Sequence, residues 1–330
     1  MTEGIFKEII CKIKRSLSLL LRKSQLPLCK GATVGNPTKN REEPIFLENV
    51  MDARQLIERS IIKKYRKSVW CKFIGGIKDY ELISPGDRIA VCISGGKDSM
   101  LMAKCFQHLQ KYSDFEFTVE FIAMDPGYAP ENLAAIKENA ELLGLPIHYF
   151  RAPIFETVEK TGGGSPCYLC ARMRRGYLYR EAQNLGCNKI ALGHHFDDFI
   201  ETTLMSMFYG AEIKTMMPKL HSQNFEGMEL IRPMCLVKEK DIISWANYNS
   251  LCFLKCACAV TRRDEESCDG SKRREMKELI KKLCEENDNV DMNIFKSMCN
   301  VNLATVIGYK RSDDDEVHLF TENYDGCEKE

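Results

Sequence analysis

The stretch that decides the fold is "RIAVCISGGKDSM", residues 88–100. It joins a β-forming run that ends at Ile93 to a segment with apolar residues at helical spacing, 100–109. Gly95 and Gly96 stand between the two and permit a tight turn. A strand, a glycine turn and a helix in this order predict an anion site, because backbone N–H groups and the positive end of the helix meet there.

The side chains of this loop suit phosphate. Two serine hydroxyls can donate hydrogen bonds, the lysine supplies a cation, and the aspartate can help to hold Mg²⁺. The loop is not a Walker A sequence, which needs four residues between its first glycine and its Gly-Lys-Ser/Thr ending. An ordinary strand-turn-helix glycine pair is the alternative. We expect phosphate groups to be bound by Ser94, Gly95, Gly96, Lys97, Asp98 and Ser99.

Strand and helix signals alternate around the loop. The expected helices cover residues 51–80, 100–109, 130–146, 171–185 and 197–210, and the expected strands cover 88–94, 117–124, 147–150 and 189–193. Strands separated by helices of this length imply right-handed crossovers. We therefore predict an α/β fold with a doubly wound, mainly parallel sheet and helical additions at both ends. Ligands of such sheets bind beyond the carboxyl ends of the strands.

Four regions are expected along the chain. Residues 1–48 hold a short basic amphipathic segment and a linker, and residues 49–250 hold the phosphate-loop domain. Residues 251–310 are a cysteine-bearing helical region, and residues 311–330 are an acidic tail. The N-terminal apolar stripe is short, which favours a surface or partner-docking segment over one that lies on a membrane.

Composition excludes several classes of protein. The 330 residues include 47 basic and 47 acidic side chains, so binding of a polyanion would need a local patch. No run of about 18 apolar residues occurs, which excludes a spanning helix on length. Sixteen cysteines are spread over the chain with no cleavable secretory signal, which predicts a reducing, cytoplasmic location with most thiols buried and inert.

A second polar cluster, "GHHFDDFIETT" at residues 193–203, follows the fourth expected strand at the same sheet edge as the loop. Asp197 or Asp198 can cap the next helix, which is the structural alternative. Two histidines and two carboxylates exceed what capping needs. We expect one carboxylate to contact magnesium and phosphate, and His194 or His195 to face the substrate.

The cysteines form two groups that suggest a metal centre. Cys167 and Cys170 are expected just before a helix, whose dipole, with the nearby arginines, favours thiolates. "LCFLKCACAV" adds Cys252, Cys256 and Cys258. Soft thiolates suit zinc or an iron-sulfur cluster, and three ligands would leave one metal position open. The spacing leaves both metals open, and a redox pair would need another sheet context.

These motifs resemble known families. "SGGKDS" is similar to the SGGxDS loop of the PP-loop ATPases, which split ATP between its α and β phosphates. "CYLCARMRRGYLYREAQNLGCNKIALGHHFDDFIETTLMSMFYG", with "MPKL" and "IRPMCLVKEKDI", looks like the TtcA family of tRNA 2-thiocytidine synthetases over roughly residues 55–262. The resemblance implies a cytosolic enzyme that uses ATP, Mg²⁺ and a 4Fe-4S cluster on three cysteines to thiolate the cytidine at position 32 of tRNA.

The resemblance also implies roles for individual residues. Cys167 and Cys170 match the family's cluster pair. The family's later pair is spaced Cys-x-x-Cys, whereas this chain has Cys256-Ala257-Cys258; Cys258 is favoured as the third ligand, with Cys256 as the alternative. Arg174 matches a basic position near the cluster. The acidic positions of the family fall on Asp98 and Asp198, and Asp125 falls where PP-loop enzymes contact the nucleoside, although a turn-opening role fits it equally.

The implied partners are tRNA and a sulfur donor such as a cysteine desulfurase, and a homodimer is compatible with this assignment. Two other functions stay open at this point. One is sulfur insertion into another tRNA base or a small molecule by the same adenylation. The other is a non-catalytic RNA-binding protein with zinc or a cluster, against which the intact "SGGKDS" argues.

Overall fold

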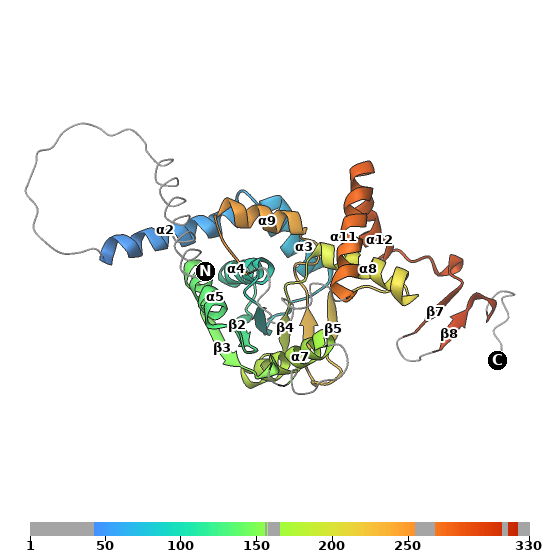
Figure 1. Cartoon of the computed structure of the whole chain (residues 1–330), viewed down its shortest axis with the longest axis horizontal. Coiled ribbons are helices and arrows are strands. Elements are labelled where there is room, and N and C mark those ends of the chain that lie inside the picture. Colours follow the sequence, from blue (N-terminus) through green and yellow to red (C-terminus); the bar gives the residue numbers. More distant parts are fainter. Residues whose placement is uncertain (1–42, 156, 158–165, 255–267, 312–315, 323–330) are drawn as a thin grey trace, which may run out of the picture. The chain divides into compact units, whose positions relative to one another are not determined.

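The computed structural model describes residues 43–155, 157, 166–254, 268–311 and 316–322 (Figure 1). A six-stranded sheet has the order β3-β2-β1-β4-β6-β5. Its strands are β1 Arg88–Ile93, β2 Thr118–Asp125, β3 Ile147–Arg151, β4 Lys189–Ala191, β5 Lys219–His221 and β6 Glu229–Ile231. All neighbours pair in parallel except β5, which runs antiparallel at the edge. The predicted doubly wound sheet is confirmed.

Helices connect the strands as the sequence predicts, with shifts of one to three residues at several ends and two larger differences. They are α2 Glu43–Ile62, the π-helix η1 Arg66–Trp70, α3 Cys71–Asp79, α4 Lys97–Tyr112, α5 Pro130–Leu143, α7 Pro166–Asn184, α8 Phe196–Gly210, α9 Glu239–Tyr248, α11 Cys268–Glu286 and α12 Val290–Ser297. The expected single helix over residues 51–80 is divided into α2, η1 and α3. The second difference is α7, which begins at Pro166 rather than near residue 171, because proline is pre-organised for the first helical position.

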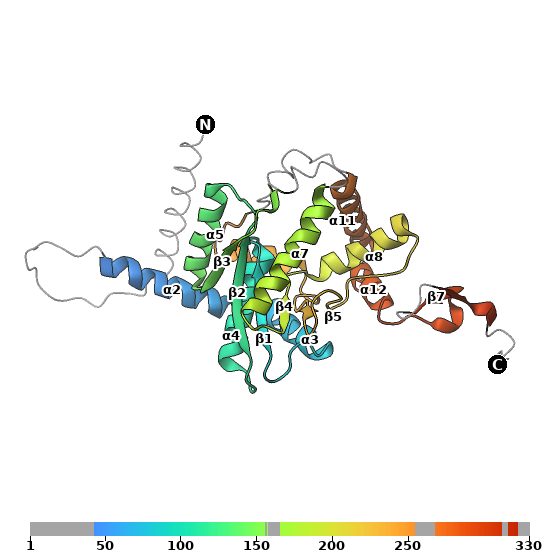
Figure 2. The ribbon, with the colours of Figure 1, turned by 90° about the horizontal axis from the view of Figure 1, so that it is seen from below.

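The two faces of the sheet bury separate apolar clusters. One cluster packs α2, α3, α4, α5 and α9 on one face, with Phe73, Phe106 and Trp245 fully buried. The other packs α7 on the opposite face through Tyr179 and Ala182, and Figure 2 shows α7 in front of the strands. This three-layer arrangement leaves the carboxyl ends of the strands for ligands.

The described chain divides into two compact units. The first combines residues up to Phe196 with Met217–Ser267, and the second combines Asp197–Met216 with the residues from Cys268 onward. The second unit includes a small antiparallel pair, β7 Gly308–Lys310 and β8 Val317–Leu319. β8 lies within the segment expected to be an acidic tail. The short β-forming stretch "VHLF" follows the run of aspartates there, and it was not predicted as a strand. The expected N-terminal amphipathic segment lies outside the described residues.

A buried ionic network joins the amino ends of β1, β4 and β6. The ammonium of Lys189 lies 2.8 Å from Asp87, 3.0 Å from Glu229 and 3.0 Å from the carbonyl oxygen of Leu82. The side chains of Lys189 and Asp87 are only 4% and 7% exposed. All three ammonium protons therefore have acceptors, which is the condition under which a buried charge is tolerated.

We expect Asp87→Asn to lower the free energy of unfolding by about 2 kcal/mol at pH 7. Burial would raise the pKa of Asp87, but hydrogen bonds from Lys189 and Asn188 outweigh burial and hold the pKa below its ordinary value. Such a carboxylate stabilises the fold above its unfolded pKa of about 3.9, and this contribution is lost as pH falls through the folded pKa. Urea unfolding from pH 7 to pH 3 measures the difference. The exposed Asp114→Asn is the control, expected within about 0.5 kcal/mol of wild type.

Candidate functional site

The phosphate loop lies where the direction of the strand order reverses. The chain runs from β1 outward through β2 and β3, then returns to β4 on the other side of β1. The loops after β1 and β4 therefore meet, and a Cβ added to Gly193 would be 3.1 Å from the backbone nitrogen of Ser99. In open parallel sheets, this crevice is where ligands bind. The loop and the segment after β4, predicted at one sheet edge, are in contact.

The geometry of the loop requires Gly95. Gly95 has a φ of +85°, and a Cβ built on it would be 2.5 Å from Cγ1 of Ile136. The hydroxyls of Ser94 and Ser99 are 3.1 Å apart, and that of Ser99 donates to the carbonyl oxygen of Gly96 at 3.0 Å. Helix α4 then begins at Lys97, so the N–H groups of Lys97, Asp98 and Ser99 have no intrahelical acceptor and can bind an anion.

Lys97 is held by two carboxylates. Its ammonium lies 3.1 Å from Asp98 and 3.0 Å from Glu239 at the start of α9. Burial lowers the pKa of Lys97, but Asp98 and Glu239 outweigh burial, so that its pKa lies above the ordinary value. The lysine is thus a fixed cation at the end of the loop. Glu239 was not among the predicted site residues. The one feature of the sequence that could have indicated it is its position eight residues after Ile231, which ends the parallel strand β6.

The two histidines after β4 have different environments. His195 is buried, and its Nε2 lies 3.9 Å from Asp98. The Nδ1 of His194 accepts a hydrogen bond from Nε of Arg232 at 3.2 Å. Arg232 also donates to the carbonyl oxygen of Met217. His195 is therefore the histidine nearer to the loop, whereas His194 is oriented by an arginine that follows β6.

Asp125 and Arg174 lie at the neighbouring strand ends. Asp125 ends β2, and its Oδ1 accepts from the backbone nitrogens of Gly127 and Tyr128 at 2.9 and 2.8 Å, which is the turn-opening role. The guanidinium of Arg174 on α7 lies 5.5 Å from the ring centroid of Phe155. Its Nε is buried and has no hydrogen-bond partner among the described residues. An orphaned buried donor of this kind suits an anionic ligand.

The acidic pair after β4 belongs to the second unit. Asp197 and Asp198 occupy the first turn of α8. Within this unit, Arg273 of α11 lies 3.2 Å from Asp198 and 3.0 Å from Glu201. Burial raises the pKa of Glu201, although Arg273 opposes this shift. Arg273 thus fixes Asp198 on the helix surface, a contact that the sequence did not indicate.

The cysteine site is described in part. Because α7 begins at Pro166, Cys167 and Cys170 lie within the first five residues of the helix, not before it. Residues three apart share one helix face. Cys170 is half-buried and packs on a small apolar cluster that includes Met124 at the end of β2. A thiol that is partly shielded by apolar side chains, as that of Cys170 is, fits a soft-metal ligand.

The candidate third ligands, Cys256 and Cys258, lie outside the described residues. The described stretch before them ends at Leu254, which lies against the phosphate loop: its Cδ1 is 3.6 Å from a Cβ built on Gly95. Within the described ranges, no group of three His, Cys, Asp or Glu side chains is placed to hold a metal ion. The choice between Cys256 and Cys258 therefore stays a prediction.

Several other thiols are buried, as expected. Burial raises the pKa of Cys92 and Cys235 to about 12 and that of Cys187 to about 11. These groups remain protonated and inert at neutral pH.

None of the described helices could span a membrane. They include no apolar stretch of the length that a bilayer requires.

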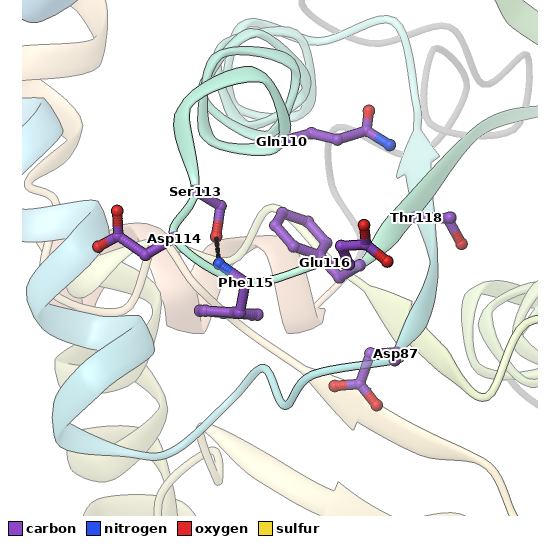
Figure 3. Close-up of a pocket in the computed structure, with 9 residues that line it drawn as sticks. Asp87, Gln110, Ser113, Asp114, Phe115, Glu116 and Thr118 are labelled. Carbon is purple, nitrogen blue, oxygen red and sulfur yellow. Dashed lines mark hydrogen bonds between the residues drawn. The ribbon is translucent and has the colours of Figure 1, made fainter.

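A depression at the opposite end of the sheet does not suit phosphate. It lies at the amino ends of β1 and β2, between the loop before β1 and the end of α4 (Figure 3). Asp87, Asp114 and Glu116 line it, and Asp87 is already paired with Lys189. Three carboxylates repel an anion, so the nucleotide site is assigned to the carboxyl ends of the strands.

Known proteins share these features. Residues 71–259, more than half of the chain, match the PP-loop domain family. The tRNA-cytidine(32) 2-sulfurtransferase of Geotalea uraniireducens is 37% identical over 228 residues, which are 68% of this chain and 88% of that protein. The namesake proteins of Geobacter metallireducens and Neisseria meningitidis serogroup A are 35% and 38% identical, over 72% and 62% of this chain and 91% and 63% of theirs.

A solved structure shows the same fold. The U34-tRNA thiolase NcsA from Methanococcus maripaludis, with its [4Fe-4S] cluster, aligns with a TM-score of 0.53 at 21% identity, over 72% of this chain and 82% of that one. The sheet order, the glycine loop and the match over residues 71–259 define a PP-loop protein. More narrowly, the chain belongs to the family of the tRNA-cytidine(32) 2-sulfurtransferases, as the sequence motifs predicted.

Proposed function

We propose that this protein is an ATP-dependent tRNA sulfurtransferase that converts cytidine 32 of the anticodon loop to 2-thiocytidine. The observation that carries the proposal is the loop at Ser94–Ser99 between β1 and α4, in contact with the segment after β4. This loop accounts for ATP use, and family membership supports the choice of base. A cytoplasmic location follows from the substrate.

The reaction has to turn a poor leaving group into a good one. The C2 oxygen of cytidine attacks the α phosphorus of ATP, the bond to the β phosphate breaks, and pyrophosphate leaves. Sulfide then attacks C2 as the nucleophile, forming the C–S bond, and AMP departs with the original oxygen. In the first step negative charge develops on the phosphates, which Lys97 and the N–H groups of the first turn of α4 stabilise.

Other residues of the proposed site bind and orient. His195 lies beside Asp98 and can keep that carboxylate in place for Mg²⁺. Arg174, whose Nε lacks a partner within the described chain, can take a phosphate of ATP or the base. Asp125 is proposed near the nucleoside. The proposal includes His194 as an ATP contact and a magnesium contact by Asp198, as the motif implies.

Cys167 and Cys170 are proposed to hold a 4Fe-4S cluster together with Cys258, or with Cys256 instead. When bound, this cluster supplies the sulfur that replaces the C2 oxygen. Both cysteines belong to α7, and around Cys170 apolar side chains such as Met124 and Ile154 limit access of water. A sulfur donor such as a cysteine desulfurase, together with a two-electron reductant that converts its persulfide sulfur to sulfide, would supply each new sulfur atom, and a homodimer is compatible with this scheme.

Lys97→Met is expected to slow tRNA-dependent pyrophosphate release by about 100-fold or more, because the fixed cation beside the phosphates is lost. The control is Lys240→Met, which removes an exposed lysine next to Glu239 at the start of α9. Single-turnover pyrophosphate release from both variants measures the difference. Equal rates in Lys97→Met and wild type would mean that the lysine does not act on the phosphates.

The function is tested by mass spectrometry of tRNA nucleosides. Cells that make 2-thiocytidine are deprived of the gene and complemented with this protein or with Lys97→Met. We expect 2-thiocytidine to disappear, and to return only with the wild-type protein. A loss of another thionucleoside instead would identify another base as the substrate. Unchanged thionucleosides, with tRNA bound by the protein, would favour the RNA-binding alternative.

A further inference from the structure

Seven exposed basic side chains occur between residues 59 and 78, a stretch without any acidic residue. They are Arg59, Lys63, Lys64, Arg66, Lys67, Lys72 and Lys78, here named the basic strip. The formal net charge of the chain is zero, so a stretch of +7 leaves −7 for the remainder. The strip is therefore a local concentration of charge that the overall composition does not explain.

The basic strip is not neutralised by the described part of the protein. None of its members forms an ion pair with a described acidic side chain, whereas the buried lysines Lys104 and Lys189 both do. Opposite charges three or four positions apart stabilise a helix, and of the seven cations only Lys78 has an acidic residue at such a spacing, Glu81. Crowding like charges costs free energy, which an anionic partner would offset.

Helix α9 connects the basic strip with the phosphate loop. Its first residue, Glu239, pairs with Lys97, and its last residue, Tyr248, has the ammonium of Lys64 3.4 Å from its ring centroid. Ten helical residues span about 15 Å. Tyr65 ties η1 to the same helix through a hydrogen bond of 2.9 Å to the carbonyl oxygen of Ser244. Figure 1 shows α9 lying beside this blue part of the chain.

We propose that the basic strip binds the phosphate backbone of the RNA whose base enters the phosphate-loop site. This inference rests on the proposed function. Tyr248 is 53% exposed beside Lys64, and an aromatic ring next to a cation can stack on an unpaired base. A lipid surface is disfavoured because it needs exposed apolar residues next to the cations. In the strip, Ile61, Val69 and Phe73 are buried.

The test removes three cations of the strip and three elsewhere. The strip variant is Lys63→Gln with Arg66→Gln and Lys67→Gln. The matched control is Lys111→Gln with Lys281→Gln and Lys282→Gln, which are also exposed and form no ion pair with described residues. Binding of unmodified tRNA is measured by fluorescence anisotropy at several salt concentrations. ATP binding, 2-thiocytidine formation and flotation with phosphatidylserine vesicles are measured alongside.

We expect the strip variant to bind tRNA about tenfold or more weakly at ~0.1 M salt, with a salt slope smaller by about 2 to 3, while ATP binding is unchanged. The control should keep the wild-type slope. Equal slopes in all three proteins, with 2-thiocytidine still formed, would overturn the strip but not the proposed function. If the wild-type protein forms no 2-thiocytidine but its tRNA binding still depends on the strip, the proposed function is overturned and the basic strip is not. Strip-dependent binding to vesicles but not to tRNA would replace RNA with a membrane.

Discussion

Gly95→Ala is expected to reduce 2-thiocytidine formation by at least about 100-fold and to weaken ATP binding. Gly95 has a φ of +85°, a region that costs about 1 kcal/mol for alanine. Its new Cβ would also meet Cγ1 of Ile136 at 2.5 Å, so the loop or α5 must shift. Either shift moves the N–H groups that face the phosphates. ATP affinity by calorimetry and nucleoside mass spectrometry measure the two effects.

Gly86→Ala is the matched control for Gly95→Ala. Gly86 has a φ of +84°, but a Cβ built there has nothing within 4 Å, and the residue lies at the opposite end of β1. The positive φ should lower the free energy of unfolding of both variants by about 1 kcal/mol, and only Gly95→Ala should lose activity. Equal activity loss in both variants would indicate general destabilisation and contradict the assignment of the loop.

Cys170→Ala is expected to abolish 2-thiocytidine formation while ATP affinity stays at the wild-type value. Thiolates hold iron-sulfur clusters, and the loss of one of three ligands on this chain should release the metal. Cys170 lies near the start of α7 and not in the phosphate loop, so nucleotide binding should be unaffected. Iron and acid-labile sulfide are measured in protein purified without oxygen, where wild type should carry about four irons per chain.

The control for the cluster is Cys71→Ala, which removes an exposed thiol on α3. It should keep the iron, the visible absorbance and the activity. Stoichiometric zinc in the wild-type protein would contradict the iron-sulfur assignment, as would full iron content in Cys170→Ala. The same measurement on Cys256→Ala and Cys258→Ala decides which of the two is the third ligand.

Local patterns predicted most of the elements of the sheet. β1, β2, β3 and the helices between them follow from the alternation of apolar residues, because burial of one face repeats with the period of each element. The edge strand β5 was not predicted, because three residues, Lys219–His221, carry no clear alternation and are paired only through β6. The break at η1 was missed for a similar reason, since the apolar spacing continues across it.

The sequence by itself determined the class of protein and the position of the ATP site, because a strand, two glycines and a helix in that order act locally. Only the tertiary structure decided which distant groups complete the site. Glu239 stands 142 residues from Lys97 and forms an ion pair with it, and His195 rather than His194 lies beside Asp98. Such contacts depend on the return of the chain to β4 next to β1, and the spacing of residues within one element does not encode that return.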